Sequence, residues 1–297
     1  MNLAEWVGAA LAAWSGVPDR SDEASTLSEE LRSLPGVARV DGRYNREPTM
    51  GYSYNVDVTL TDDATGENAL DVAGWYYSSF TREFARHTSR FVVRQGAHVL
   101  RAFSDDRHRT SPITETERWF RLIHELPGAV DWAAHSDTTR GSGSIELVLD
   151  RPARTGDPAL LAALPELLAR HADDLADRHW IIRWRRLRLD LLGSRYPVSE
   201  VFSLISRLAT DGQWSASYDP STDPALKLAV WAETPDLMEA TARAHLALIR
   251  TLGFPVSYTV RANLTSPVEI VVGGHLTGGN ELQQRLNREF GAGCELH

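Results

Sequence analysis

The chain has 297 residues, of which 42% are hydrophobic and 24% charged, a composition typical of a folded globular protein and not of a disordered one. Its formal net charge of −9 argues against a general nucleic-acid or anionic-membrane binder, because both functions need a basic surface. The one cysteine, Cys294, excludes an internal disulfide framework and any site with several thiolate ligands.

The first segment of the chain, residues 1–26, is expected to form a short amphipathic helix followed by a polar linker over Ser15–Thr26. Glu5 interrupts its apolar stretch and no basic residue precedes it, so it does not have the pattern of a signal peptide. With Met1 as the native start we expect a cytoplasmic protein, and that expectation fails if Met1 replaces a removed export signal. No apolar run approaches the ~20 residues that a bilayer requires, so we expect no stable membrane insertion.

A first group of elements is expected over residues 27–103. Thr26 and Glu29 have the spacing of a capping box, and Pro35-Gly36 ends the helix that they would begin. The expected elements are a helix over Leu27–Leu34, a hairpin of Val37–Asn45 with Tyr52–Leu60 that has one wet face, a helix through Ala69–Phe84, and a strand over Phe91–Phe103 with Gly96 as a candidate break.

The same order of elements recurs twice more. Between residues 104 and 192 we expect a helix over Thr114–Leu126, a hairpin of Val130–Ser136 with Ser144–Asp150, a helix from Pro158 to Leu175, and a strand over Trp180–Leu192. Between residues 193 and 297 we expect a helix over Ser199–Leu208, a hairpin of Trp214–Tyr218 with Leu226–Trp231, a helix from Pro235 to Leu252, strands over Val256–Leu264 and Val268–Val272, and a closing helix over Asn280–Phe290.

Three helix–hairpin–helix–strand orders in register indicate a repeat, with Leu34-Pro35-Gly36 and Leu126-Pro127-Gly128 at equivalent points. The predicted domains are therefore an N-terminal helix and linker over 1–26 and three modules over 27–103, 104–192 and 193–297.

The last strand of the second copy has a further feature, because its apolar residues change parity near Arg185-Arg186. Side chains alternate strictly along a strand, so either a bulge or a strand that passes from one module's sheet to the next would explain the change. The second explanation gives each copy a β-α-β-β-α-β order. That order, with a helix ending in Leu-Pro-Gly-Val before a strand, resembles the ferredoxin-like α/β plait. The resemblance implies an α+β fold of three tandem plait modules with mainly antiparallel sheets.

The densest basic run is formed by Arg183, Arg185, Arg186 and Arg188, which could hold a phosphate, a carboxylate ligand or an acidic partner helix. The parity change places Arg183 and Arg185 on the opposite face from Arg186 and Arg188. We therefore favour the alternative that these arginines are solvent faces paired with acids of neighbouring elements.

A glycine-rich segment, Gly273–Asn280, joins a strand to a helix. Gly274, His275 and Gly278 could direct backbone N–H groups at a phosphate, although the segment lacks the lysine of a P-loop and the spacing of a dinucleotide fingerprint. Asn280 is three residues before Gln283, which is the spacing of a helix cap, and a connector is the favoured interpretation.

The only dense His/Asp cluster lies between His171 and His179. His171 and Asp174 are i,i+3 neighbours, but these residues alternate with packing leucines and read as the polar face of a helix. We therefore predict no metal and no cofactor, and no catalytic motif stands out in the sequence.

Three functions remain open. The first hypothesis is a non-catalytic protein-binding or assembly protein, which predicts a protein partner, no nucleic acid, and apolar surface patches of interface size. The second is a regulatory protein that binds a small molecule at module junctions, supported by the arginine run and the glycine-rich segment. The third is an enzyme whose active-site residues are dispersed along the chain.

Overall fold

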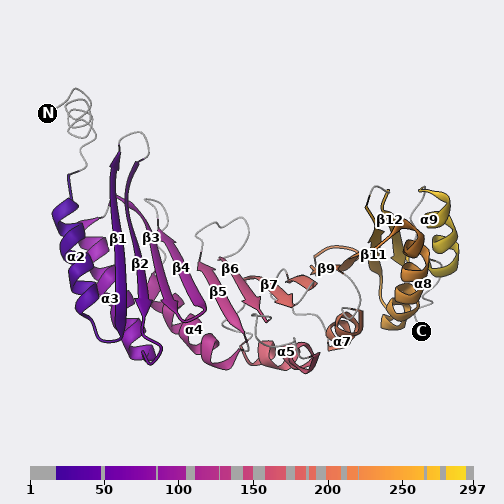
Figure 1. Cartoon of the computed structure of the whole chain (residues 1–297), viewed down its shortest axis with the longest axis horizontal. Coiled ribbons are helices and arrows are strands. Elements are labelled where there is room, and N and C mark those ends of the chain that lie inside the picture. Colours follow the sequence, from indigo (N-terminus) through magenta and orange to yellow (C-terminus); the bar gives the residue numbers. More distant parts are fainter. Residues whose placement is uncertain are drawn as a thin grey trace. The chain divides into compact units, whose positions relative to one another are not determined.

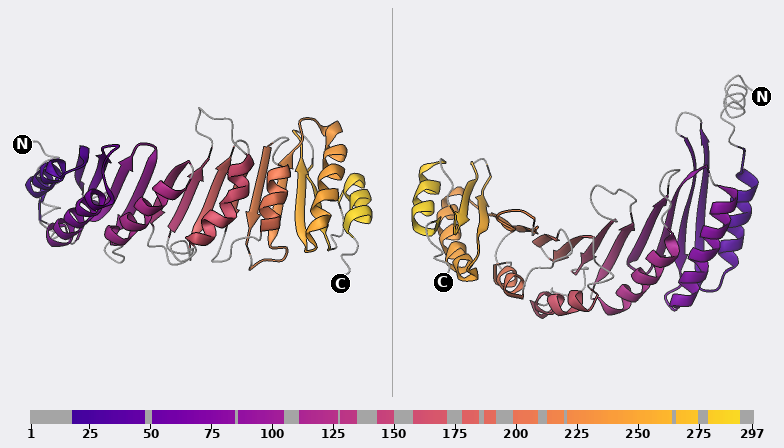
Figure 2. Two further views of the ribbon diagram at one scale, coloured as in Figure 1. Left: turned by 90° about the horizontal axis from the view of Figure 1, so that it is seen from below. Right: turned by 180° about the vertical axis from the view of Figure 1, so that it is seen from behind.

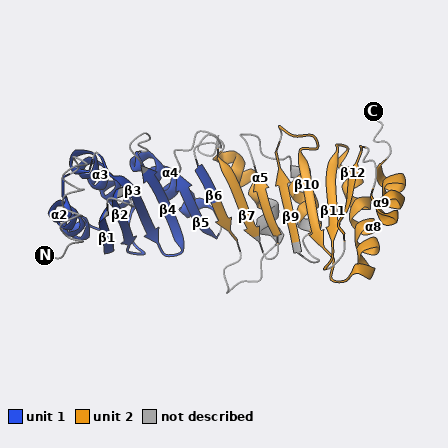
Figure 3. Ribbon diagram, turned by 90° about the horizontal axis from the view of Figure 1, so that it is seen from above, with its two compact units in different colours: residues 1–145 blue, residues 146–297 orange. Residues whose placement is uncertain are grey.

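The structure, a computed structural model, describes residues 18–47, 51–84, 86–104, 111–126, 128–134, 143–149, 158–171, 178–184, 187–191, 199–208, 213–219, 221–263, 266–274 and 279–291. The chain divides into two compact units, residues 1–145 and 146–297 (Figure 3). The three module boundaries expected from the sequence remain a prediction.

Unit 1 begins with a helix and then alternates hairpins with helices (Figure 1). Its elements are α2 (Ser21–Ser33), β1 (Val37–Glu47), β2 (Gly51–Leu60), α3 (Gly66–Glu83), β3 (Thr88–Gln95), β4 (His98–Ser104), α4 (Pro112–Glu125) and β5 (Ala129–Ala134), and β6 (Gly143–Val148) crosses the boundary between the units.

Unit 2 continues the same alternation. Its elements are α5 (Pro158–Arg170), β7 (His179–Trp184), β8 (Leu187–Leu191), α7 (Ser199–Leu208), β9 (Gln213–Tyr218), β10 (Leu226–Trp231), the 3₁₀ turn η1 (Pro235–Leu237), α8 (Met238–Ile249), the 3₁₀ turn η2 (Arg250–Leu252), β11 (Val256–Arg261), β12 (Val268–Val272), α9 (Glu281–Leu286) and the π-helical turn η3 (Asn287–Gly291).

In each unit the described strands form a mixed sheet in which each strand neighbours the next one along the chain. In unit 1, β1 and β2 are antiparallel, β2 and β3 parallel, β3 and β4 antiparallel, and β4 and β5 parallel. In unit 2 the same alternation runs from the antiparallel pair β7 and β8 to the antiparallel pair β11 and β12. The chain reverses direction inside each hairpin, whereas a connecting helix returns it to a parallel neighbour.

In each unit the helices lie on one face of the strands. Figure 2 shows α2, α3 and α4 against one face of β1–β5, and α5, α7 and α8 against one face of the strands of unit 2. Figure 3 shows, for each unit by itself, the opposite face of the strands with the helices of that unit behind them. None of the described helices covers this second face, which we call the uncovered face.

Alternation along the strands produces this one-sided packing. In β2, Tyr54, Val56, Val58 and Leu60 are buried against the helices, and the residues between them are only partly buried. The aromatic rings continue this core across the sheet, since Tyr76 of α3 stacks on Phe91 of β3 with centroids 4.4 Å apart. The wet face expected for the first hairpin is confirmed.

The prediction of one long third strand in each of the first two copies is wrong, because two antiparallel strands form a hairpin in each place. β3 and β4 pair from Ser89 with Ser104 to Gln95 with His98, and the turn between them contains Gly96 at φ +53°. β7 and β8 pair up to Trp184 with Leu187. Facing residues of an antiparallel pair share one face, so the turn, and not a bulge or a change of sheet, produces the parity change near Arg185-Arg186.

The α+β class is confirmed, but the finer expectation of ferredoxin-like plaits is not. A split β-α-β unit holds a strand between its two parallel strands, whereas β2 and β3 are direct neighbours here, and so are β10 and β11. The pairing is also mixed and not mainly antiparallel. Wherever a helix connects one described hairpin to the next strand, the two strands that it joins are parallel.

Two expected helix starts are wrong. α2 begins at Ser21, within the expected linker, so Thr26 lies inside the helix; α4 begins at Pro112, before Thr114. The true capping box is at Thr65, whose side chain accepts the Asn68 N–H while the Asn68 side chain accepts the Thr65 N–H. The amphipathic helix expected in residues 1–14 lies outside the described residues.

Candidate functional site

The uncovered face of unit 1 carries the candidate site. β1, β2 and β3 present alternate residues to this face, and the register brings those residues into rows: Asp41 lies opposite Asp57, and Arg43 lies opposite Asn55. Parallel pairing of β2 with β3 then places Asn55 beside Arg90. Residues from three separate parts of the sequence meet here because the sheet joins them.

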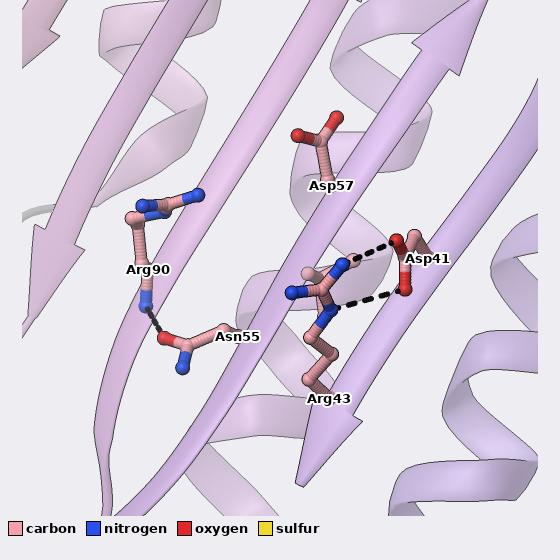
Figure 4. A pocket seen from close by; sticks show the side chains of 6 residues that line it. Asp41, Arg43, Asn55, Asp57 and Arg90 are labelled. Atoms are coloured by element: carbon pink, nitrogen blue, oxygen red, sulfur yellow. Dashed lines mark hydrogen bonds and ion pairs between the residues drawn. The ribbon is translucent and has the colours of Figure 1, made fainter.

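These residues line a hollow of about 240 Å³ (Figure 4). Arg43 donates hydrogen bonds to both carboxylate oxygens of Asp41, with its Nη2 3.1 Å from Oδ2. The Asn55 Oδ1 accepts the backbone N–H of Arg90 at 3.0 Å, which anchors the rim of the hollow on β3. The Arg90 side chain is exposed and forms no ion pair with any described residue.

The electrostatics of the hollow favour binding over proton transfer. The hydrogen bond from Arg43 lowers the pKa of the Asp41 carboxyl below its ordinary value. A carboxylate kept ionised in this way is a weak base at neutral pH, and none of the described residues that line the hollow carries a hydroxyl, thiol or imidazole. What the hollow offers a ligand is therefore an array of fixed charges and an amide.

The charged pairs continue across the sheet and cover an apolar residue. Arg94 of β3 binds Asp57 of β2, and Arg101 of β4 forms an ion pair with Asp131 of β5. Val92 lies on the uncovered face, in register with Asp57 and Arg101, and yet it is fully buried. Long arginine side chains can cover apolar surface with their aliphatic stems, and Arg101 is the direct neighbour of Val92 on β4.

Unit 2 has its own charged pairs on its uncovered face. Arg183 of β7 and Arg188 of β8 lie directly opposite each other, so the expectation that they occupy opposite faces is wrong. Arg183 forms an ion pair with Glu146, and Arg188 binds Asp190 at 2.9 and 3.0 Å. Each arginine has its own acid, which supports the interpretation of this run as a paired solvent face. Arg185 and Arg186 lie outside the described residues.

The described ends of the glycine-rich segment follow β12 and precede α9, in the last part of unit 2. The Asn280 Oδ1 accepts the Gln283 N–H at 2.9 Å, so Asn280 caps α9 as its spacing indicated. Gly274 follows β12 and donates its N–H to the Val271 carbonyl, while His275 and Gly278 lie outside the described residues. Three strands separate β8 from β12, a distance of about 19 Å, so Arg188 and Asn280 belong to different places.

The expected His/Asp cluster falls largely outside the described residues, and His171 is buried. Within the described ranges, no group of His, Cys, Asp and Glu has the arrangement of a metal site. None of the described helices is long and apolar enough to cross a membrane.

Sequence reasoning missed the hollow, although part of its signal was visible. The alternation of β2 placed Asn55 and Asp57 on the wet face. Their partners Arg90 and Arg94 come from a strand that begins 28 residues after β2 ends (Leu60 to Thr88), and only the parallel register joins them. Comparisons of the chain with protein-family models, with curated proteins and with solved structures gave no match.

Proposed function

We propose that this chain is a non-catalytic protein-binding protein, and that the uncovered, charge-lined face of its strands receives the partner. The observation that carries the proposal is the one-sided packing: helices cover one face of each unit, while the other bears ordered rows of arginine and carboxylate side chains. Such rows select a partner by charge complementarity and steer its approach.

The proposed contact is polar and not apolar. The large hydrophobic residues exposed among the described residues are only Trp75, Ile113 and Leu237, which lie on α3, α4 and η1. None of the three lies on a strand, so they give the uncovered face no apolar patch of the size that a hydrophobic partner would need. We therefore expect binding to weaken as salt concentration rises.

We further propose that residues 27–103, 104–192 and 193–297 are successive copies of one helix–hairpin–helix–hairpin unit. The order of elements supports this, since α2, α4 and α7 each precede a hairpin, a second helix and a second hairpin.

The single lysine of the chain offers a direct test. Lys227 is exposed on the uncovered face of β10, in register with Ser217 and Ser257. An amine-reactive photo-crosslinker therefore attaches at one side chain, plus the N-terminal amine. Lys227→Arg gives the background from the N-terminal amine alone.

Charge-conserving exchanges then move the lysine. Lys227→Arg with Arg39→Lys places it on the uncovered face of β1, and Lys227→Arg with Arg82→Lys places it on α3; the two arginines are 76% and 72% exposed. We expect the same partner to be crosslinked in extracts of the source cells from Lys227 or from position 39, and far less from position 82. Equal yields from both faces, or no yield above background at any site, would contradict the proposal.

A second candidate function is binding of a small zwitterionic ligand in the hollow of unit 1. Arg90 could bind a carboxylate group there while Asp41 or Asp57 binds an ammonium group. Thermal-shift measurements with amino acids and nucleotides test this directly. Stabilisation that Arg90→Gln abolishes supports the candidate, and no stabilisation by any of them rejects it.

A further inference from the structure

The outer edge of β1 is the feature of unit 1 that the proposed partner face does not use. β1 is the first strand in the sheet order and pairs only with β2 among the described residues. Arg32 of α2 donates from Nη2 to the Val40 carbonyl at 3.4 Å, so the backbone of Val40 faces away from β2. Because backbone direction alternates along an antiparallel strand, Gly42 and Tyr44 share this outward direction.

A groove runs between this edge and α2. It has a volume of about 580 Å³, more than twice that of the hollow on the uncovered face. The α2 wall presents the small side chains of Ser21, Ala24, Ser25 and Ser28 and, further along the helix, the charged side chains of Glu29 and Arg32. The β1 wall includes Gly42, which is exposed. Figure 1 shows α2 beside β1 at this end of the unit.

The rest of unit 1 shows what normally lies against such a helix wall. α3 connects β2 to the parallel β3, and α4 connects β4 to the parallel β5, so each of these helices joins two neighbouring strands. α2 leads into β1, and no described strand precedes it. The groove therefore has the location that a further strand beside β1 would require.

The rim of the groove carries a charge that is only partly neutralised. Arg39 and Arg43 point to the uncovered face of β1, two positions on either side of Asp41, and are 76% and 78% exposed. Among described residues they share that one carboxylate, at 3.9 Å from Arg39 and 3.1 Å from Arg43. A strand paired with β1 would place its own alternate side chains opposite these two arginines.

We propose that this groove binds an extended peptide segment of a protein partner, which pairs its backbone with β1 and places two acidic side chains, four residues apart, opposite Arg39 and Arg43. The residues between the two acids that face α2 are no larger than valine, because Ser21, Ala24, Ser25 and Ser28 form the part of that wall opposite them. The inference rests on the proposed protein-binding function and names the class of segment that is bound. This is strand addition to an exposed sheet edge, in which main-chain hydrogen bonds give affinity and alternate side chains give specificity.

The probe is a fluorescein-labelled synthetic peptide of sequence SEVTVES, whose two glutamates are four residues apart. Two further peptides serve as matched controls. In one, lysines replace both glutamates; in the other, the glutamates remain and alternate backbone nitrogens on the β1-facing edge are methylated, which removes the pairing donors. Fluorescence anisotropy with the full-length protein measures each Kd.

We expect the acidic peptide to bind at least about tenfold more tightly than the lysine peptide, and the methylated peptide not to saturate up to about 1 mM. Arg39→Glu combined with Arg43→Glu reverses the preference between the acidic and lysine peptides. Ser25→Phe fills the groove from α2 and weakens binding of all of them, with circular dichroism as the check that it folds.

Equal affinity for the acidic and lysine peptides, or unchanged binding of the methylated peptide, overturns the inference. So does a protein that binds no peptide and forms a dimer that Arg39→Glu dissociates, because a second copy would then occupy the edge. If the peptides fail while crosslinking from Lys227 still captures a partner, the groove assignment alone is rejected and the proposed function stands.

Discussion

Arg94 on β3 forms a bidentate contact with the carboxylate of Asp57 on β2, donating from Nε to Oδ1 at 2.9 Å and from Nη2 to Oδ2 at 2.9 Å. The two residues are 37 positions apart and meet because α3 returns the chain to a strand parallel to β2. The contact belongs to the uncovered face, on which Asp57 is the register neighbour of the buried Val92.

The first prediction concerns the energy of this pair. The two side chains are 38% and 28% exposed, so solvent screens the attraction, and a double-mutant cycle with Asp57→Ala and Arg94→Ala should give a coupling of about 0.5–1 kcal/mol. Urea unfolding followed by tryptophan fluorescence measures it. The coupling should shrink in 1 M salt, where the screening length is about 3 Å. A coupling of zero at low salt would show that the fork is not formed in solution.

The second prediction concerns a buried contact between α4 and β5. The Trp132 indole N–H donates to Glu115 Oε2 at 2.8 Å, and both residues are buried. Glu115→Ala leaves that N–H without this acceptor and should lower the free energy of unfolding by about 1–3 kcal/mol. Glu115→Gln keeps an acceptor oxygen and should cost less. Equal losses for the two variants would show that the hydrogen bond contributes little and that packing dominates.

The third prediction uses two glycines as a matched pair. Gly36 has φ +76°, and a Cβ placed there would lie 2.9 Å from the Cβ of Asn68, the N3 residue of the capping box that Thr65 begins at α3. Gly36→Ala should therefore destabilise the protein by about 1–3 kcal/mol. Gly74 lies within α3, where an added Cβ meets nothing within 4 Å, so Gly74→Ala should stabilise by about 0.5–1 kcal/mol. Thermal or urea denaturation should give changes of opposite sign; the same sign for both would contradict the backbone argument.

The fourth prediction concerns acid stability and Asp190. Burial raises the pKa of this carboxyl, but hydrogen bonds from His179 and Arg188 outweigh burial, so its pKa in the folded protein is below the ordinary value of 3.8. A carboxyl group whose pKa is lower in the folded than in the unfolded protein stabilises the fold at pH values above its unfolded pKa. This stabilisation is lost as the pH falls below 3.8 and passes through the pKa of the folded protein.

Asp190→Asn should therefore be less stable than wild type at neutral pH, and the difference should narrow below about pH 4. Urea midpoints measured from neutral to acidic pH test this, with Lys227→Arg, which keeps its charge, as the control that should follow the wild-type curve. A difference that stays constant across the whole range would mean that Asp190 is not held ionised by its partners.

Much of the secondary structure could be predicted from local patterns. The alternation of Tyr54, Val56, Val58 and Leu60 marked β2 and its buried face, and β12 has the expected bounds of Val268–Val272. Side-chain periodicity is a local property of the chain, so it survives without knowledge of the partners. Helix starts were predicted less well. α2 begins at Ser21, and its N-cap residue, Arg20, forms no side-chain capping hydrogen bond, so no capping pattern in the sequence marks this start.

The spacing of apolar residues along the chain is enough to identify which residues face a core, including the parity change between Trp184 and Leu187. The meaning of that change depends on strand pairing, because a turn, a bulge and a change of sheet leave the same apolar pattern. The hollow at Asp41, Asn55 and Arg90 and the groove beside β1 also depend on strand register. Register is set by pairings between distant segments, and no pattern within one segment contains it.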